Sequence, residues 1–187
     1  MILFFDTETT GKLDFKSDMT AAQQPNLVQI AALLQDQHRK TVGQINFIIA
    51  PQGWIVTAEV AAIHGITNDR AIRYGVPIKT ALSAFSNFCK NAEILVAHNL
   101  QFDLRVMETA YFRAGLPHGM AKMMKYCTMS VSTDICRLPG NYGKYKWPKL
   151  SEAYKHFFNC DFEGAHDAMH DVDAMVKIYW KLKDAGH

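Results

Sequence analysis

Three short apolar runs lie within the first fifty residues of this chain, and a fourth follows only after two segments with helical patterns. The runs cover residues 1–5, 27–34, 44–49 and 94–97. Short apolar runs bounded by polar or turn residues are typical of buried strands, because a helix would need roughly ten or more residues of pattern. The first three runs are separated only by loops, which predicts an antiparallel meander of three strands.

Helical patterns alternate with further strands in the rest of the chain. We expect helices over residues 57–64, 77–89, 102–114, 150–158 and 167–183, and a fifth strand over residues 126–129. Thr57 and Pro77 suit the starts of the first two helices, and Gly65 and Gly115 suit helix ends. A meander followed by alternating helices and strands predicts an α/β domain with a mixed five-stranded sheet flanked by helices.

Size and composition favour one globular domain over residues 1–187. The chain has 187 residues, 49% of them hydrophobic and 20% charged, so it can bury a large core. Its formal net charge of +2 is too small to indicate nucleic-acid binding by itself. The four cysteines lack the spacing of a zinc site and are expected to be reduced. Neither a secretory signal nor a membrane span is present, so we expect a soluble cytoplasmic protein with no membrane partner.

The first strand leads directly into two acids, Asp6 and Glu8. Side chains two residues apart on a strand point to the same face, so both carboxylates should project together. Two like charges this close repel unless a cation lies between them, and oxygen ligands suit Mg²⁺ or Mn²⁺ better than zinc or copper. An isolated pair of this kind more often marks a solvated strand end. The metal hypothesis therefore depends on further acids.

Two later segments supply such acids. Asp103 ends the stretch 98–103, which follows the fourth strand directly. Near the C-terminus, His166 precedes the predicted last helix, and Asp167 and Asp171 lie at its start. Asp167 is placed to stabilise the helix N-terminus, whereas Asp171 lies at the margin of the core-facing stripe. Four carboxylates from three distant segments could thus meet at one edge of the sheet.

Together, these segments resemble the three motifs of the DnaQ-like DEDDh 3′–5′ exonucleases, a family that includes the proofreading subunit of bacterial DNA polymerase III and freestanding relatives. The motifs are Asp6-x-Glu8 followed by Thr-Thr-Gly, His98-Asn99-x-x-Phe102-Asp103, and His166 separated by four residues from Asp171. They occur in the family's order and span nearly the whole chain. The related DEDDy subgroup has a tyrosine four residues before the last acid. Asp167 occupies that position here, which favours the histidine type.

The resemblance implies a ribonuclease H-like fold and hydrolysis of DNA from its 3′ end, with release of nucleoside 5′-monophosphates. It also implies two Mg²⁺ ions, with Mn²⁺ as a substitute. The ligands would be Asp6, Glu8, Asp103 and Asp171, with Asp6 bridging both ions. Such ions can activate a water and stabilise the leaving oxygen. His166 would be the general base, because an unperturbed histidine pKa of about 6.5 suits proton transfer near neutral pH.

The same resemblance places substrate contacts beside the first two motifs. The residues implied are Thr7, Thr9, Thr10, Gly11 and His64 for the terminal nucleotide, and His98, Asn99 and Phe102 from the second motif. For His64, termination of a helix is the alternative role. For His98 it is a structural hydrogen bond, and Phe102 is expected to pack.

A basic and aromatic segment near residue 145 is a further candidate for substrate binding. Lys144, Tyr145 and Lys146 combine charges that can pair with phosphates and a ring that can stack on a base. The alternative is an ordinary solvated loop with Trp147 anchored in the core.

Three functional interpretations follow. The leading one is a DNA exonuclease that prefers single strands or frayed ends, because the terminal nucleotide must be separated to enter a narrow pocket. An RNA exonuclease or oligoribonuclease of the same family is the alternative, because the shared motifs do not report on the 2′-hydroxyl. A catalytically silent nucleic-acid-binding module would have lost an acid or the histidine, and none is missing. A DNA polymerase is a candidate partner, although no tail for docking on one extends beyond the last helix, which favours a self-sufficient domain.

Overall fold

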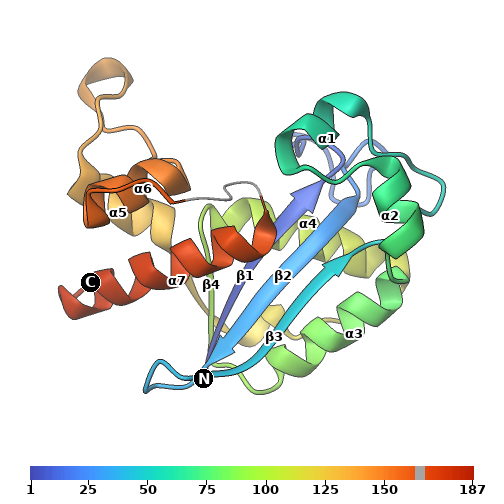
Figure 1. Cartoon of the computed structure of the whole chain (residues 1–187), viewed down its shortest axis with the longest axis horizontal. Coiled ribbons are helices and arrows are strands. Elements are labelled where there is room, and N and C mark those ends of the chain that lie inside the picture. The colour runs from blue at the N-terminus through green and yellow to red at the C-terminus, as the bar shows by residue number, and fades with distance from the viewer. Residues whose placement is uncertain (163–166) are drawn as a thin grey trace.

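A mixed five-stranded sheet with helices on both faces forms the centre of the computed structural model, which describes residues 1–162 and 167–187 (Figure 1). The strands are β1 (Ile2–Thr9), β2 (Leu27–Gln35), β3 (Thr41–Ile48), β4 (Ile94–Ala97) and β5 (Met124–Cys127), in the spatial order β3-β2-β1-β4-β5. The first three are antiparallel, whereas β4 runs parallel to β1 and β5 parallel to β4. The meander and the mixed sheet predicted from the apolar runs are confirmed.

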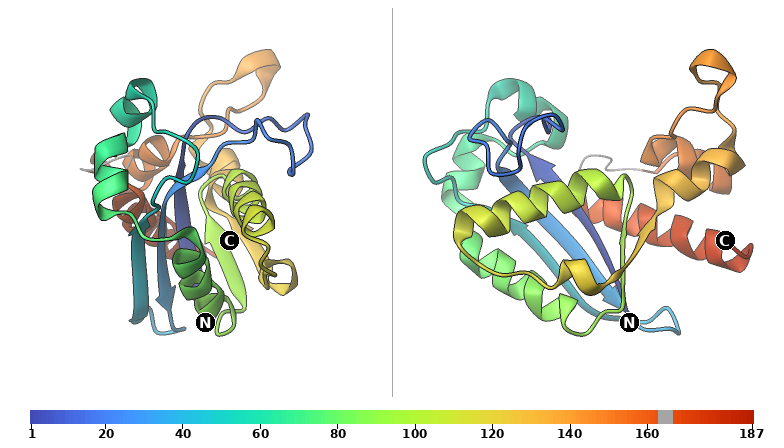
Figure 2. Two further views of the ribbon diagram at one scale, coloured as in Figure 1. Left: turned by 90° about the vertical axis from the view of Figure 1, so that its right-hand side faces the viewer. Right: turned by 180° about the vertical axis from the view of Figure 1, so that it is seen from behind.

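Helices cover both faces of this sheet and one of its ends. They are α1 (Ala58–His64), α2 (Asn68–Tyr74), α3 (Ile78–Cys89), α4 (Leu100–Ala114), α5 (Thr128–Cys136), α6 (Leu150–Phe158) and α7 (Ala168–Asp184), with short 3₁₀ turns η1 (Met120–Lys122) and η2 (Asn141–Gly143). In Figures 1 and 2, α7 crosses one face, and α3 and α4 cover the other. Helices α5 and α6 pack beside α7, while α1 and α2 lie near the end of β1.

Two helices were missed by the sequence prediction. The seven-residue α2 is too short to show a clear apolar stripe. Its sequence signal is the N-cap residue Thr67, whose Oγ1 accepts a hydrogen bond from the backbone N–H of Arg70 at 3.1 Å. In α5, threonine, valine and isoleucine lower the intrinsic helix propensity. This helix begins where the fifth strand was expected to continue, so β5 ends at Cys127 instead of Met129. Packing against α6 and α7 stabilises it despite its composition.

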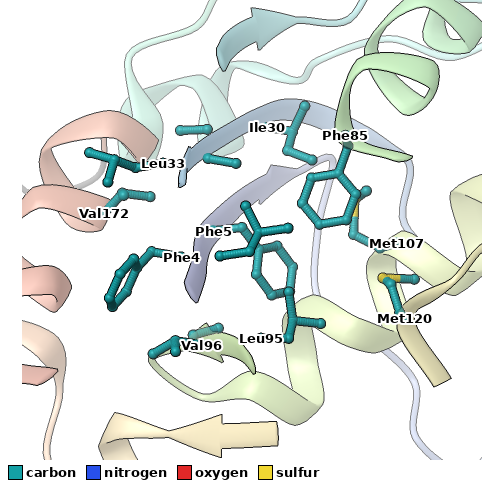
Figure 3. Close-up of a cluster of buried hydrophobic side chains, with 14 of the residues drawn as sticks. Phe4, Phe5, Ile30, Leu33, Phe85, Leu95, Val96, Met107, Met120 and Val172 are labelled. Atoms are coloured by element: carbon teal, nitrogen blue, oxygen red, sulfur yellow. The ribbon is translucent and has the colours of Figure 1, made fainter. Parts of the chain in front are cut away.

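The central strand β1 buries alternate side chains on opposite faces of the sheet. Phe4 packs edge-on against Tyr179 of α7, with ring centroids 5.1 Å apart, and Phe5 contacts Phe85 of α3 at 5.3 Å. Figure 3 shows this division, with Phe4 on the side of Val172 and Phe5 on the side of Phe85. Even-numbered residues of β1 therefore face α7, and odd-numbered residues face α3 and α4.

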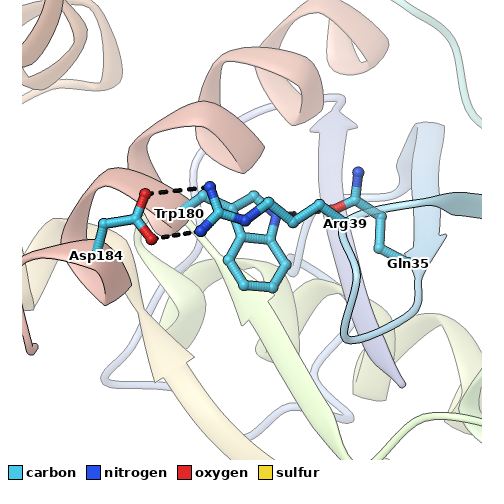
Figure 4. Close-up of polar contacts among 4 residues, drawn as sticks. All are labelled: Gln35, Arg39, Trp180 and Asp184. Carbon is cyan, nitrogen blue, oxygen red and sulfur yellow. Dashed lines mark hydrogen bonds and ion pairs between the residues drawn. The ribbon is translucent and has the colours of Figure 1, made fainter.

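A polar cluster ties the β2–β3 hairpin to the last turns of α7 (Figure 4). Nε1 of Trp180 donates to Oε1 of Gln35 at 2.8 Å, and the guanidinium of Arg39 lies 4.7 Å from the centre of the Trp180 ring. Arg39 also pairs with Asp184. Exposed ion pairs contribute about 1 kcal/mol or less, so this cluster orients α7 more than it stabilises the fold. The orientation matters because the opposite end of α7 carries Asp171.

Two expectations about chemical environment can be compared with the structure. All four cysteines are free thiols, as predicted from their spacing. Among the described ranges, no helix combines the length and the apolar character needed to cross a membrane.

Candidate active site

The two acids of the first motif lie where β1 extends past its neighbour β4. β4 pairs only with residues 2–4 of β1, whereas β2 accompanies β1 as far as Thr9. Asp6 and Glu8 are therefore open on one side, at the carboxyl end of two parallel strands. In open α/β sheets, this is where ligands bind. Both side chains are half-buried and lie on the face covered by α7.

Helix α7 brings a third carboxylate to the same point. Asp171 lies in its first turn, and one oxygen from each of Asp6, Glu8 and Asp171 lies within 4.8 Å of the others. The direction of the helix is set by Asp167, whose Oδ1 accepts a hydrogen bond of 3.0 Å from the backbone N–H of Met169. The capping role predicted for Asp167 is confirmed.

The fourth carboxylate comes from the first turn of α4. Asp103 is buried, and its Oδ1 accepts hydrogen bonds from the backbone N–H and the hydroxyl of Thr7, at 3.1 and 2.7 Å. Thr7 lies between Asp6 and Glu8 on β1. These bonds therefore tie Asp103 to the strand that carries the first motif.

Burial and mutual repulsion raise the pKa values of these carboxyl groups. Burial, followed by repulsion from Asp103, Asp171 and Glu8, raises the pKa of Asp6 well above its usual range. Burial and then the charge of Asp171 raise the pKa of Glu8 to about 8. Burial raises the pKa of Asp103 to about 7, although both hydrogen bonds from Thr7 act in the opposite direction. The cluster thus concentrates negative charge that a bound cation would neutralise.

The donor set fits a hard divalent cation. The three clustered ligands are carboxylates, and oxygen is the ligand atom that Mg²⁺ and Mn²⁺ prefer. In addition, the charged groups that shift the pKa values of Asp6 and Glu8 are all acids. The group has the composition of a metal site whose balancing charge comes from a bound ion.

The residues that follow Glu8 form a tight turn. Oγ1 of Thr9 donates to the carbonyl of Gly11 at 2.6 Å, and Oγ1 of Thr10 accepts a hydrogen bond from the backbone N–H of Asn26 at 2.9 Å. Both hydroxyls thus maintain the turn. At Gly11, no atom lies within 4 Å of the position that a Cβ would occupy. The proposed contacts with a terminal nucleotide would therefore come most easily from the backbone around Gly11.

His64 lies at the end of α1 and is buried. Its Nδ1 accepts a hydrogen bond of 3.1 Å from the backbone N–H of Ile66, and Gly65 adopts a left-handed conformation with φ 71°. The structure therefore places His64 in the helix-terminating role that was its alternative. A contact of its other ring edge with substrate stays a prediction.

His98, from the second motif, connects the start of α5 to the loop before α6. Its Nε2 lies 3.0 Å from the carbonyl of Pro148, and its Nδ1 lies 2.9 Å from Oγ1 of Thr128. Burial lowers the pKa of His98 to about 4, so the ring is neutral at pH 7. Because a carbonyl can only accept, Nε2 carries the proton and Nδ1 accepts from the hydroxyl of Thr128. Sequence reasoning missed Thr128, which lies 30 residues away without a motif of its own.

The other two candidates of the second motif differ in environment. Phe102 packs against the core, as expected. Asn99 has the left-handed conformation, with φ 72°, and stands directly before α4. It lines a surface cavity on the side of the helix that faces α5.

The basic and aromatic segment lies between α5 and α6. Nζ of Lys146 pairs with Glu152 at 2.5 Å, and the same carboxylate accepts a hydrogen bond from the backbone N–H of Lys149 at the start of α6. Lys146 therefore stabilises the start of a helix. Lys144 and Tyr145 are exposed. The alternative in which Trp147 is anchored in the core is wrong, because 68% of its surface is accessible.

Comparison with protein families shows the family to which this chain belongs. The RNase T family model, described as exonuclease, matches residues 3–179. The chain belongs to this exonuclease family. The resemblance to DnaQ-like 3′–5′ exonucleases that was inferred from the three motifs is confirmed at the family level.

The relatives of this exonuclease are longer proteins, of which the chain matches only a part. It is 32% identical over 182 residues to the PolC-type DNA polymerase III of Streptococcus pyogenes serotype M1, an alignment that covers 97% of this chain and 11% of the polymerase. In structure, it resembles E. coli exonuclease I in complex with a dT13 oligonucleotide, with a TM-score of 0.76, 20% identity and coverage of 97% of this chain and 40% of that chain. A zinc-bound complex of the same E. coli enzyme with single-stranded DNA gives a TM-score of 0.75 at 20% identity, covering 99% and 40%. These similarities confirm the ribonuclease H-like fold.

One predicted catalytic residue of this exonuclease, His166, lies outside the described residues. Its role as general base stays a prediction. The four predicted carboxylates, in contrast, are all described and converge on the end of β1.

Replacement of Thr7 by valine tests how the exonuclease positions Asp103. Valine keeps the volume but removes the hydroxyl donor, at a cost of about 1–3 kcal/mol in stability. Because the hydrogen bonds from Thr7 lower the pKa of Asp103, we expect the acid limb of the pH–rate profile to move to higher pH. Thr7→Ser retains the hydroxyl and is the matched control. An identical profile for Thr7→Val and wild type would contradict the positioning role.

Proposed function

We propose that this exonuclease hydrolyses single-stranded DNA from its 3′ end with two divalent cations, Mg²⁺ or Mn²⁺, and releases nucleoside 5′-monophosphates. The observation that supports this most strongly is the convergence of Asp6, Glu8, Asp103 and Asp171 where β1 extends past β4. Acids gathered in this way repel one another, and cations held between them and a phosphate would relieve this repulsion.

Some residues of the site would hold the cations, and others position the side chains that do so. Asp6, Glu8 and Asp171 would hold the cations, with Asp6, by resemblance, shared between both. The hydrogen bonds from Thr7 hold Asp103 next to β1, where it would join the other three acids. When bound, such cations activate a water and stabilise the leaving oxygen. His166, by resemblance, would accept the proton of the attacking water. Asp167 contributes indirectly, because its cap fixes the helix turn that presents Asp171.

The relatives support single-stranded DNA as the substrate of this chain. The superimposed E. coli exonuclease I is bound to a dT13 oligonucleotide in one structure and to dA16 in another, and the relative in sequence is a DNA polymerase. An exonuclease must also separate the last nucleotide from any partner strand before it can cleave behind it. Because the aligned region belongs to a polymerase in S. pyogenes, docking on a DNA polymerase is included among the partners to be tested.

Time courses on matched DNA and RNA oligonucleotides with a 5′ label test this proposal. With Mg²⁺, we expect a ladder of products that shortens from the 3′ end of single-stranded DNA, and slower shortening of RNA and of blunt duplex DNA. EDTA should stop the reaction, and added Mg²⁺ should restore it. Faster shortening of RNA would replace DNA with RNA as the substrate. The absence of any shortening with Mg²⁺ or Mn²⁺ would contradict the proposal.

A further inference from the structure

A cavity of about 300 Å³ lies at the start of helix α4, on the side of the helix that faces α5. Its walls include Asn99, Leu100, Leu104, Cys127, Met129 and Trp147. This volume is at the lower end of the roughly 300–1,000 Å³ that is typical of ligand pockets. A pocket of this size suits one small planar group.

The cavity shares its framework with the active site. Leu100 and Leu104 lie one helical turn apart on α4, and Asp103 belongs to the same turn but is directed at Thr7 on β1. Asn99 joins this turn to the end of β4. A group held in the cavity would therefore lie within about one helical turn, roughly 5 Å along the axis, of an active-site residue.

Trp147 forms an exposed aromatic wall on a fixed backbone. The residue after it, Pro148, receives a hydrogen bond of 3.0 Å from the neutral ring of His98, and the residue before it, Lys146, donates from its backbone N–H to the carbonyl of Leu138 at 3.0 Å. The indole nevertheless leaves 68% of its surface accessible. The indole therefore offers a free aromatic face at the edge of the cavity.

The charge of the segment that carries Trp147 indicates the class of partner. Residues 137–149 contain four basic residues, Arg137, Lys144, Lys146 and Lys149, and no acidic residue, although Lys146 is paired with Glu152 of α6. Such a segment attracts a polyanion, and bases of single-stranded nucleic acids stack on exposed aromatic rings without sequence preference. An aromatic wall, aliphatic side chains and a basic segment next to them together fit a nucleobase on a phosphate backbone.

The position of the cavity indicates which nucleotide it would hold. In Figure 1, α1 and the region of α5 and α6 flank the end of β1 from opposite sides. The terminal nucleotide is proposed to lie on the side of Gly11 and α1. A 3′ exonuclease cleaves between the last two nucleotides, so the penultimate nucleotide must lie on the other side of the carboxylates, where the cavity is.

We propose that the Trp147 cavity binds the base of the penultimate nucleotide, on the 5′ side of the bond that is cleaved. This inference rests on the proposed function for the identity of the strand and its direction. Stacking on Trp147 holds the strand while the last nucleotide is removed. The same contact tolerates every base, because each base presents an aromatic face.

The test combines a protein variant with a substrate that lacks one base. Trp147→Ala should weaken binding of a single-stranded octanucleotide of thymidine about 5- to 150-fold, the change that corresponds to the roughly 1–3 kcal/mol of one base stacked on a ring. Fluorescence anisotropy in EDTA measures this binding without hydrolysis. Trp147→Phe should retain most of the affinity. Tyr142→Ala, which removes a fully exposed aromatic residue of the same loop, should change neither affinity nor rate.

An abasic residue at the penultimate position locates the contact. For wild type, it should weaken binding about as much as Trp147→Ala does, and the two changes together should be no worse than either alone. Additive losses, or a Trp147→Ala affinity equal to that of Tyr142→Ala, would overturn the inference. The proposed function fails separately, if wild type binds the oligonucleotide but does not shorten it with Mg²⁺ or Mn²⁺.

Discussion

Asp6→Asn should abolish hydrolysis while leaving the fold intact. The asparagine keeps the shape of the side chain but removes one negative charge from the cluster, in which one oxygen of Asp6 lies within 4.8 Å of oxygens of Glu8 and Asp171. Cations that stabilise charge on a phosphate contribute several kcal/mol to catalysis, and a loss of about 4 kcal/mol lowers the rate roughly 1,000-fold. Single-turnover hydrolysis of a labelled DNA oligonucleotide measures this loss.

Two variants make this result specific. Glu8→Gln should reduce the rate less than Asp6→Asn, because Glu8 is proposed to contact chiefly one cation. Asp173→Asn removes an exposed acid from the same helix as Asp171 and should leave the rate unchanged. If Asp6→Asn kept more than about a tenth of the wild-type rate, the carboxylate cluster would not be the catalytic centre. Oligonucleotide binding by Asp6→Asn without hydrolysis would exclude the silent-module interpretation for the wild type.

The second large effect is on stability, which a rise in pH should lower and bound metal should increase. An acid whose pKa is higher in the folded chain binds more protons there than in the unfolded chain, between its two pKa values. Stability therefore falls as pH rises through that interval. For Glu8 the interval runs from the ordinary 4.5 to about 8, and for Asp103 from 3.8 to about 7. The lowered pKa of His98 acts in the opposite direction between about 4 and 6.5, because the unfolded chain binds the extra proton there. The chain without metal should thus lose stability most clearly between about pH 6.5 and pH 8.

Exposed acids elsewhere do not obscure this effect. Hydrogen bonds with Ser17 and Lys16 lower the pKa of Asp14. A hydrogen bond from Arg39 to Asp184 lowers the pKa of Asp184 in the same way. Groups of this kind contribute stability above their unfolded pKa of 3.8 and lose it as pH falls through the lower folded value. Their interval lies below about pH 4. It does not overlap with the interval of Glu8 and Asp103.

Thermal unfolding in EDTA and in Mg²⁺ measures the effect. At pH 8, Mg²⁺ should raise the Tm of wild type by several degrees, and at pH 5 it should have little effect because protons occupy the cluster. In EDTA at pH 8, Asp6→Asn should unfold at a higher temperature than wild type, by about 2–4 °C for each kcal/mol of repulsion that is removed. A lower Tm for Asp6→Asn than for wild type in EDTA would contradict the proposed repulsion.

The fold followed from the sequence where local pattern and packing agreed. The apolar run before Asp6 became the central strand, and the turn signals at Gly65 and Gly115 became left-handed helix ends. The pattern failed for α5, where residues of low helix propensity form a helix because α6 and α7 cover them. Such packing partners are distant in sequence, so local propensity does not contain them.

For the site, sequence reasoning found the acids but not what holds them. The motif predicts Thr7 as a substrate contact, whereas its hydroxyl donates a hydrogen bond to Asp103, 96 residues away. Similarly, the ring of His98 is held by Thr128 and Pro148, which belong to no motif. Motifs show which side chains carry chemistry. The hydrogen bonds that orient them depend on how strands and helices meet in space.

The central claim is that Asp6, Glu8, Asp103 and Asp171 form a metal site that acts on the 3′ end of DNA. Anomalous diffraction from crystals soaked with Mn²⁺ and thymidine 5′-monophosphate tests it most directly. We predict two anomalous peaks beside Asp6, with Glu8, Asp103 and Asp171 around them and the phosphate of the nucleotide in contact with both. A bound nucleotide with no anomalous peak at these carboxylates, or with Mn²⁺ at a different site, would contradict the account.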